Sequence, residues 1–71
     1  MNKINPEKLL QSKWTAVKPV RKEKHFLVTE LEFDEEGEVV HCLIDAVISN
    51  RSVRIQWREL QNNDNWLQGW K

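Results

Sequence analysis

The side chains best suited to metal chemistry lie within five positions of one another, at His41, Cys42 and Asp45. Thiolate, imidazole and carboxylate are the usual zinc ligands, but they must converge on one point. This stretch has the composition of a β-strand, in which successive side chains point to opposite faces of the sheet. We therefore expect His41 and Asp45 on one face and Cys42 on the other, with no metal site and no cofactor.

A histidine could also work with a carboxylate as a general acid and base. Glu30 and His41 form the one plausible couple, and cross-strand ion pairs of this kind are common structural features. Cys42 would lie in a core strand, where thiols are inert, and Ser49 and Ser52 fit a turn. The 71 residues contain no glycine-rich phosphate loop, no His-Glu-x-x-His motif and no nucleophile elbow. The sequence therefore predicts a protein that is not an enzyme.

Basic side chains gather in two stretches that could contact nucleic-acid phosphates. They form a loop and a stripe along a later strand, comprising Lys18, Arg21, Lys22, Lys24, Arg51, Arg54 and Arg58. A tryptophan between such patches would add base stacking to phosphate contacts, as in single-strand binders. Acidic and basic residues are nevertheless equal in number, eleven of each. Binding of RNA or single-stranded nucleic acid is therefore the alternative function.

The charges are sorted along the chain although their sum is zero. Residues 1–25 hold seven basic and two acidic side chains, residues 26–48 hold seven acidic and no basic ones, and residues 49–71 hold four basic and two acidic ones. We expect adjacent strands of opposite charge to neutralise each other, and a bipolar surface is the alternative.

Four tryptophans and no tyrosine are the strongest compositional signal. Trp66 and Trp70 could anchor a protein partner, because tryptophan is enriched at interface hot spots. They could instead cover the sheet, since a domain this small is short of core. We expect at least one of them to pack on the sheet. The function favoured is a small non-catalytic binding module, a protein-interaction or adaptor domain.

The length of the chain predicts one domain, residues 1–71. Cys42 is the only cysteine, so no intrachain disulfide can form and a reducing compartment is favoured. No signal peptide is recognisable, and no apolar run approaches the roughly 20 residues of a membrane-spanning helix. We expect a cytoplasmic protein that does not enter a membrane.

The elements that would position these side chains are mainly β. Asn5 and Pro6 predict the start of a short N-terminal helix, with Asn5 as its cap. Strand-forming residues follow at 13–17, and Lys18-Pro19 is expected to end that strand and lead into an exposed basic connection. Near the end of the chain, Trp66 to Gln68 is expected to form one helical turn stopped by Gly69.

Three further strands are predicted as a meander over residues 24–33, 38–48 and 53–58, with four-residue turns between them. Both hairpins then place one apolar set on the same face: Leu27, Leu31, Phe33, Val40, Cys42, Ile44, Ala46, Ile48, Val53, Ile55 and Trp57. The other face holds Phe26, Val28, Leu43 and Val47 and needs cover from the termini. This favours a small curved antiparallel sheet of about four strands, an SH3- or Sm-like partial barrel, and an α+β arrangement is the alternative.

Four motifs spread over the chain support a family resemblance. They are Asn5-Pro6-x-Lys8-Leu9-Leu10-x-Ser12-Lys13-Trp14-Thr15-Ala16-Val17, Glu23-Lys24-His25-Phe26, Trp57-Arg58-Glu59-Leu60 and Trp66-Leu67-Gln68-Gly69-Trp70. With them the chain resembles a family of short tryptophan-rich bacterial proteins. The resemblance implies no activity, ligand or functional residue, so the chemistry must be read from the residues themselves.

Overall fold

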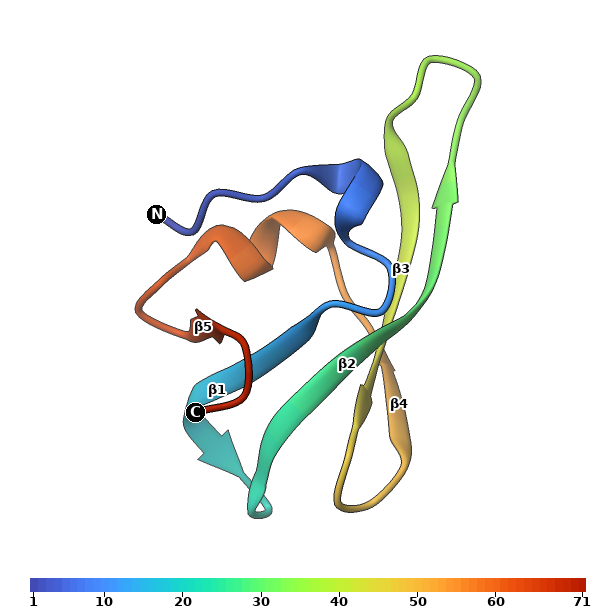
Figure 1. Cartoon of the computed structure of the whole chain (residues 1–71). Helices are drawn as coiled ribbons and strands as arrows, with labels where there is room; N and C mark the ends of the chain where they lie inside the picture. The colour runs from blue at the N-terminus through green and yellow to red at the C-terminus, as the bar shows by residue number, and fades with distance from the viewer.

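The computed structural model describes residues 1–71 and contains one five-stranded antiparallel sheet (Figure 1). The elements in chain order are η1 Pro6–Lys8, β1 Lys13–Val20, β2 Glu23–Phe33, β3 Val39–Ala46, β4 Arg51–Arg54, η2 Trp57–Gln61 and β5 Trp66–Gln68. The strand order is β4-β3-β2-β1-β5. The predicted mainly β fold is confirmed. The α+β alternative is wrong, because the helical segments are only two 3-10 turns.

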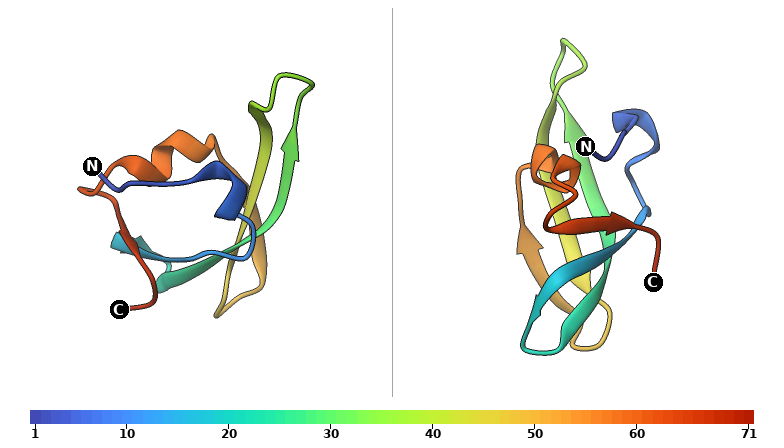
Figure 2. Two further views of the ribbon diagram at one scale, coloured as in Figure 1. Left: turned by 45° about the horizontal axis from the view of Figure 1, so that its top comes forward. Right: turned by 90° about the vertical axis from the view of Figure 1, so that its left-hand side faces the viewer.

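The sheet is bent but open, because β4 and β5 are its two outer strands. The two views of Figure 2 show η2 and the N-terminal segment lying side by side across one end of the concave face. A backbone hydrogen bond joins them, from Asn2 N to Gln61 O at 2.9 Å. Both non-strand segments therefore cover the same part of the core.

The predicted N-terminal helix is reduced to the single turn η1. Asn5 caps it as expected, since its side chain accepts a hydrogen bond from Glu7 N at 3.1 Å. The turn ends at Lys8 because the next residue, Leu9, is drawn into the core with 1% of its surface exposed. Burial of Leu9 in the core is thus the reason that the helix does not continue.

One hydrophobic cluster holds the fold together. Its eight buried members are Leu9, Trp14, Phe26, Val28, Cys42, Ile44, Ala46 and Leu60. Trp14 is the largest side chain among those that are fully buried, and its indole nitrogen donates to Ser12 Oγ at 2.8 Å. The buried indole therefore has the acceptor that its N–H requires.

The predicted register of β2 against β3 is wrong, and a bulge is the reason. Val28 pairs with Ile44 and Leu31 with Cys42, so Thr29 is an additional residue between two regular stretches. A bulge of this kind switches the face on which later side chains lie. Phe26 and Val28, which were expected on the face opposite Cys42 and Ile44, consequently share the core with them.

A second irregularity near the end of the same hairpin affects Val40. Phe33 pairs with Val39 while Glu32 pairs with His41, which leaves Val40 without a partner in the register. Val40 is 52% exposed and Phe33 is 43% exposed, although both were expected on the core face. The tip of this hairpin extends beyond the body of the molecule (Figure 1), so it has no core to face.

In the second predicted hairpin the turn lies two residues earlier and the pairing is shifted by four residues, yet the faces of Val53 and Ile55 are correct. Ile44 pairs with Val53 instead of Trp57, because the turn covers residues 47–50, with Asn50 at φ +56°. An even shift preserves the side on which every residue lies. Val53 and Ile55 therefore pack against the core as expected, whereas Ile48 is exposed in the turn.

The prediction that Lys18-Pro19 ends the first strand is also wrong. β1 continues to Val20 and joins β2 through a two-residue turn, in which Arg21 and Lys22 have φ values of +58° and +62°. Positive φ at both positions matches the type I′ turns of tight hairpins. Pro19 is tolerated because the pairing of β1 with β2 is irregular between Thr15 and Val20.

The C-terminal segment forms a strand instead of the predicted helical turn. In β5, Trp66 pairs with Ala16 and Gln68 with Trp14, which adds a fifth strand beside β1. Gly69 follows at φ +82°, and its N–H donates to Lys13 O at 2.7 Å. Pairing with β1 satisfies backbone groups that a lone helical turn would leave free.

Candidate binding groove

A groove of about 220 Å³ opens on the concave side of the sheet, between β1 and β4. Phe26 and Ile44 from the central strands form its apolar floor. We call it the β1–β4 groove and define it by Ala16, Lys18, Val20, Glu23, Phe26, Ile44, Arg51, Val53, Ile55 and Trp66. Seven of these ten residues are hydrophobic. The groove exists because β1 and β4 face each other across the bent sheet and do not pair.

Glu23 closes one end of this groove as a buried carboxylate. It is 3% exposed and accepts hydrogen bonds from Arg51 Nε at 3.1 Å and from the Ser49 hydroxyl at 2.5 Å. The hydrogen bonds from Arg51 and Ser49 lower the pKa of Glu23 from 4.5 to about 2. Sequence reasoning missed this site and placed Glu23 in an exposed connection, since only the displaced turn brings Ser49 and Arg51 to it.

Glu23 gives the first prediction, a pH-dependent stability. Its folded pKa is lowered, so its stabilising contribution is present above pH 4.5 and is lost as the pH falls from about 4.5 to about 2. Glu23→Gln should therefore be less stable than wild type at pH 7, and the difference should shrink between pH 4.5 and pH 2. Urea denaturation of both proteins across this range measures it.

Glu36→Gln is the matched control for this experiment, because Glu36 is exposed in the β2–β3 turn. Its difference from wild type should stay small at every pH. If the difference between wild type and Glu23→Gln were the same at pH 7 and pH 2.5, the ion pair would not stabilise the fold.

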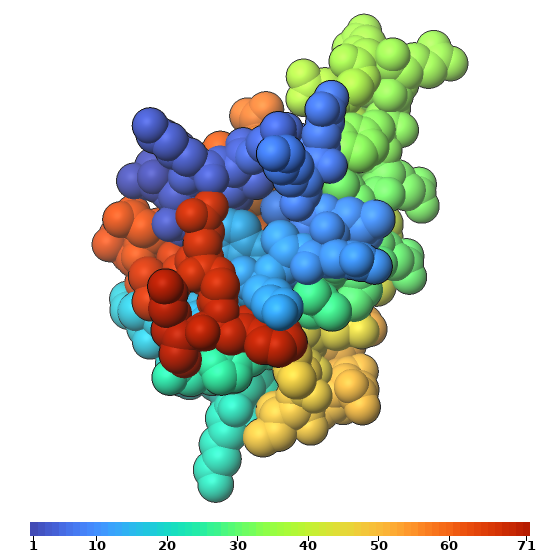
Figure 3. Space-filling model, viewed as in Figure 1, coloured from blue at the N-terminus to red at the C-terminus, as the bar shows by residue number.

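The predicted basic loop and stripe do not form one continuous surface. Lys18, Arg21, Lys22 and Lys24 are exposed on and around the β1–β2 turn, while Arg51 is held by Glu23. Lys18 and Arg51 line the β1–β4 groove. The basic β1–β2 turn and the acidic β2–β3 turn lie at opposite ends of the molecule (Figure 3). The charges of the two turns therefore do not neutralise each other, and the bipolar alternative describes them better.

The predicted strand at 53–58 and its stripe of arginines are wrong, because β4 ends at Arg54 and Arg58 lies in η2. Both arginines lie apart from the basic turn, around a second hollow of about 670 Å³ that also contains Trp57. The guanidinium carbon of Arg58 is 5.6 Å from the centroid of the Trp57 ring, and Arg58 Nη2 is 4.0 Å from a Glu38 carboxylate oxygen. One face of the indole is thus already taken by an arginine.

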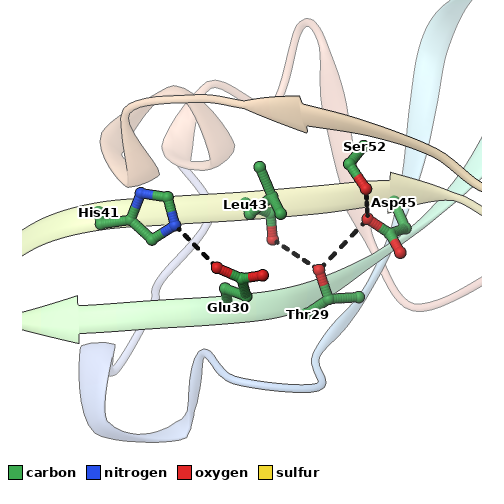
Figure 4. A network of polar contacts seen from close by, with 6 residues as sticks. All are labelled: Thr29, Glu30, His41, Leu43, Asp45 and Ser52. Atoms are coloured by element: carbon green, nitrogen blue, oxygen red, sulfur yellow. Dashed lines mark hydrogen bonds and ion pairs between the residues drawn. The ribbon is translucent and has the colours of Figure 1, made fainter.

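The histidine, carboxylate and hydroxyl side chains that could act in acid–base chemistry lie on the outer face of the sheet (Figure 4). His41 Nε2 lies 3.2 Å from Glu30 Oε1, which agrees with the expected couple. Asp45 Oδ1 lies 2.6 Å from the Ser52 hydroxyl and 3.3 Å from the Thr29 hydroxyl. The histidine and the serine are thus bonded to different carboxylates, and no nucleophile–base pair forms.

Cys42 lies on the core side of β3 with 1% of its surface exposed, away from this cluster. Burial raises the pKa of its thiol from 9.0 to about 11, which keeps it protonated at neutral pH. No group of three or more His, Cys, Asp and Glu side chains is arranged to hold a metal ion.

The two C-terminal tryptophans have different environments. Trp66 is half-buried and packs edge-on against Phe26, with ring centroids 5.2 Å apart. Trp70 is 42% exposed, and its indole nitrogen donates to Phe26 O at 3.0 Å. Its ring also lies near His25 at 5.8 Å and under Lys13 Nζ at 4.8 Å. Trp66 therefore belongs to the wall of the core and of the groove, and Trp70 is fixed on the surface.

A family model described as Tryptophan-rich protein (DUF2389) matches residues 12–71. The match includes every strand and all four tryptophans. The chain belongs to this tryptophan-rich family. No curated protein and no solved structure matches it significantly. None of its helical segments has the length and apolar character needed to cross a membrane.

Proposed function

We propose that this member of the tryptophan-rich family is a non-catalytic protein-interaction module that binds its partner in the β1–β4 groove. The observation that carries the proposal is the apolar groove itself, in which the partly exposed Val53, Ile55 and Trp66 line the walls above a buried floor. Apolar depressions with a few polar groups at their rim are typical binding sites. Trp66 in the wall supplies the residue type most enriched at interface hot spots.

The absence of a nucleophile–base pair on the outer face supports a binding role over catalysis. The free, buried thiol of Cys42 supports a reducing compartment, and we propose a cytoplasmic setting for that reason.

Single-stranded nucleic acid remains the second candidate, and the hollow around Trp57 is the specific observation in its favour. Arg54 lines this hollow and Arg58 lies over the indole, where both could contact phosphates. Glu59 in the same hollow and Glu38 beside Arg58 oppose a polyanion. We therefore rank this candidate below the groove.

Photocrosslinking in cells of the source organism tests the proposed function. A photoreactive phenylalanine analogue in place of Val20, 70% exposed at the rim of the groove, should form a protein adduct of defined mass. The same analogue in place of Leu10 is the matched control, because Leu10 is apolar and 49% exposed but lies outside the groove. Equal adducts from both positions, or none from Val20, would contradict the proposal.

A further inference from the structure

β4 presents a strand edge that no other segment pairs with. It is the outermost strand beside β3, and Ile55 N donates to Cys42 O at 3.0 Å just beyond its end. In an antiparallel ladder, alternate residues direct both backbone groups toward the same neighbour. The backbone N–H and C=O groups of Val53 and Ile55 thus point toward β3. Those of Ser52 and Arg54 point away from the sheet.

On the opposite side of the sheet, the edges of β5 and β1 are covered or blocked. The N-terminal segment covers β5, where Asn2 Nδ2 donates to Trp66 O at 2.8 Å and Gln68 Nε2 donates to Lys3 O at 2.7 Å. β1 extends beyond its pairing with β5, but Pro19 lies in that extension and has no N–H to donate. β4 is therefore the edge bordering the β1–β4 groove that can accept another strand.

A strand added to β4 would place side chains against the β1–β4 groove. Val53 faces the groove, so every second side chain of an added strand would lie on the same concave face, beside the floor formed by Phe26 and Ile44. The remaining side chains would lie on the outer face, where Arg54 is exposed. The site thus favours apolar residues at alternate positions.

The charges around this edge favour an acidic occupant. Lys18 and Arg51 line the groove, and the exposed Arg21 and Lys22 lie at the β1–β2 turn beside it. The one carboxylate in the groove, Glu23, is already bonded to Arg51. Because Arg51 is neutralised by Glu23, the exposed Arg54 is the arginine of β4 that would attract a strand of opposite charge.

We propose that the β1–β4 groove binds an extended segment of a partner protein that adds to β4 as a further strand, with apolar side chains in the groove and acidic side chains on the outer face beside Arg54. Main-chain hydrogen bonds to Ser52 and Arg54 supply affinity, and the alternating side chains supply specificity. This inference rests on the proposed function and specifies the chemistry of the partner.

The test uses an end-blocked, fluorescently labelled peptide, Glu-Val-Glu-Ile-Glu-Val-Glu, and measures its anisotropy with the whole protein. Ser52→Pro removes an outward N–H that makes no bond within the sheet, and Ser52→Ala is the matched control, since both lose the bond to Asp45. We expect Ser52→Pro to bind the peptide about tenfold more weakly than Ser52→Ala does. Arg54→Glu should weaken binding by about tenfold as well. The analogous lysine peptide should not bind.

Amide hydrogen exchange on the wild-type protein provides a readout that needs no substitution. With the acidic peptide bound, exchange at Ser52 and Arg54 should slow by about tenfold or more. Unchanged exchange, equal affinity of Ser52→Pro and Ser52→Ala, or equal binding of the lysine peptide would overturn the proposal. Sedimentation showing that wild type self-associates while Ser52→Pro stays monomeric would also overturn it, because a second copy would then be the occupant of the edge.

The two proposals fail in different ways. If the crosslinks from position 20 form equally well in the Ser52→Pro and Ser52→Ala proteins, strand addition is wrong and the groove remains a binding site. If position 20 forms no adduct, the proposed function itself is wrong, whatever the peptide does.

Discussion

Replacing Trp14 with alanine is expected to remove about 3–5 kcal/mol from the free energy of unfolding. The side chain is 2% exposed and is the largest of the fully buried ones. At roughly 0.05–0.15 kcal/mol per residue, a 71-residue protein has only about 4–11 kcal/mol in total. Trp14→Ala should therefore leave a substantial unfolded population at 37 °C, measurable by circular dichroism and urea denaturation.

Leu67→Ala is the control for the Trp14 experiment, since Leu67 is also apolar but 39% exposed. Its effect should stay below about 1 kcal/mol. Trp14→Phe should be intermediate, because it keeps most of the apolar volume and loses the hydrogen bond to Ser12. A Trp14→Ala protein as stable as Leu67→Ala would show that the core is not built around Trp14.

Deleting residues 66–71 is expected to lower the melting temperature by more than about 10 °C. The deletion removes β5 and the contact of Trp66 with Phe26, and exposes part of the groove floor. It also removes both backbone partners of the buried Thr15 hydroxyl, which donates to Gly69 O at 2.7 Å and accepts from Lys71 N at 2.9 Å. A loss of about 2–3 kcal/mol for the indole alone, plus an unsatisfied buried hydroxyl, supports this magnitude.

Thermal unfolding of the deletion variant beside Trp66→Ala and Trp70→Ala separates the contributions. Trp66→Ala should account for most of the loss and Trp70→Ala for a small part, because Trp70 is 42% exposed. An unchanged melting temperature after deletion would mean that the C-terminal strand adds nothing to the core.

The sequence was sufficient to predict the mainly β class of fold and four of the five strands, β1 to β4. The alternation at Val53 and Ile55 placed both on the correct face, even though their pairing with β3 was shifted by four residues, because an even shift preserves faces. The bulge at Thr29 could not be predicted from the alternation of apolar and polar residues. A single extra residue exchanges the two faces of the strand beyond it. That bulge explains why Phe26 and Val28 were placed on the wrong face.

Contacts between distant segments explain the remaining differences. Trp66 to Gln68 becomes a strand because the open edge of β1 offers backbone partners, and no local pattern in the tail indicates this. The buried pair of Glu23 and Arg51 depends on residues 28 positions apart. The distribution of the basic residues between the groove, the outer face and the hollow at Trp57 could not be predicted without the strand order.

The measurement that tests the central claim most directly is a photocrosslinking scan over every candidate surface of the molecule. The photoreactive residue is placed in turn at Val20 in the groove, at Val40 beside the Trp57 hollow, and at Trp70 on the C-terminal surface. If the β1–β4 groove is the binding site, position 20 should give the dominant adduct, and that adduct should be a protein. Dominant adducts from position 40 or 70, or adducts that ribonuclease removes, would contradict the account.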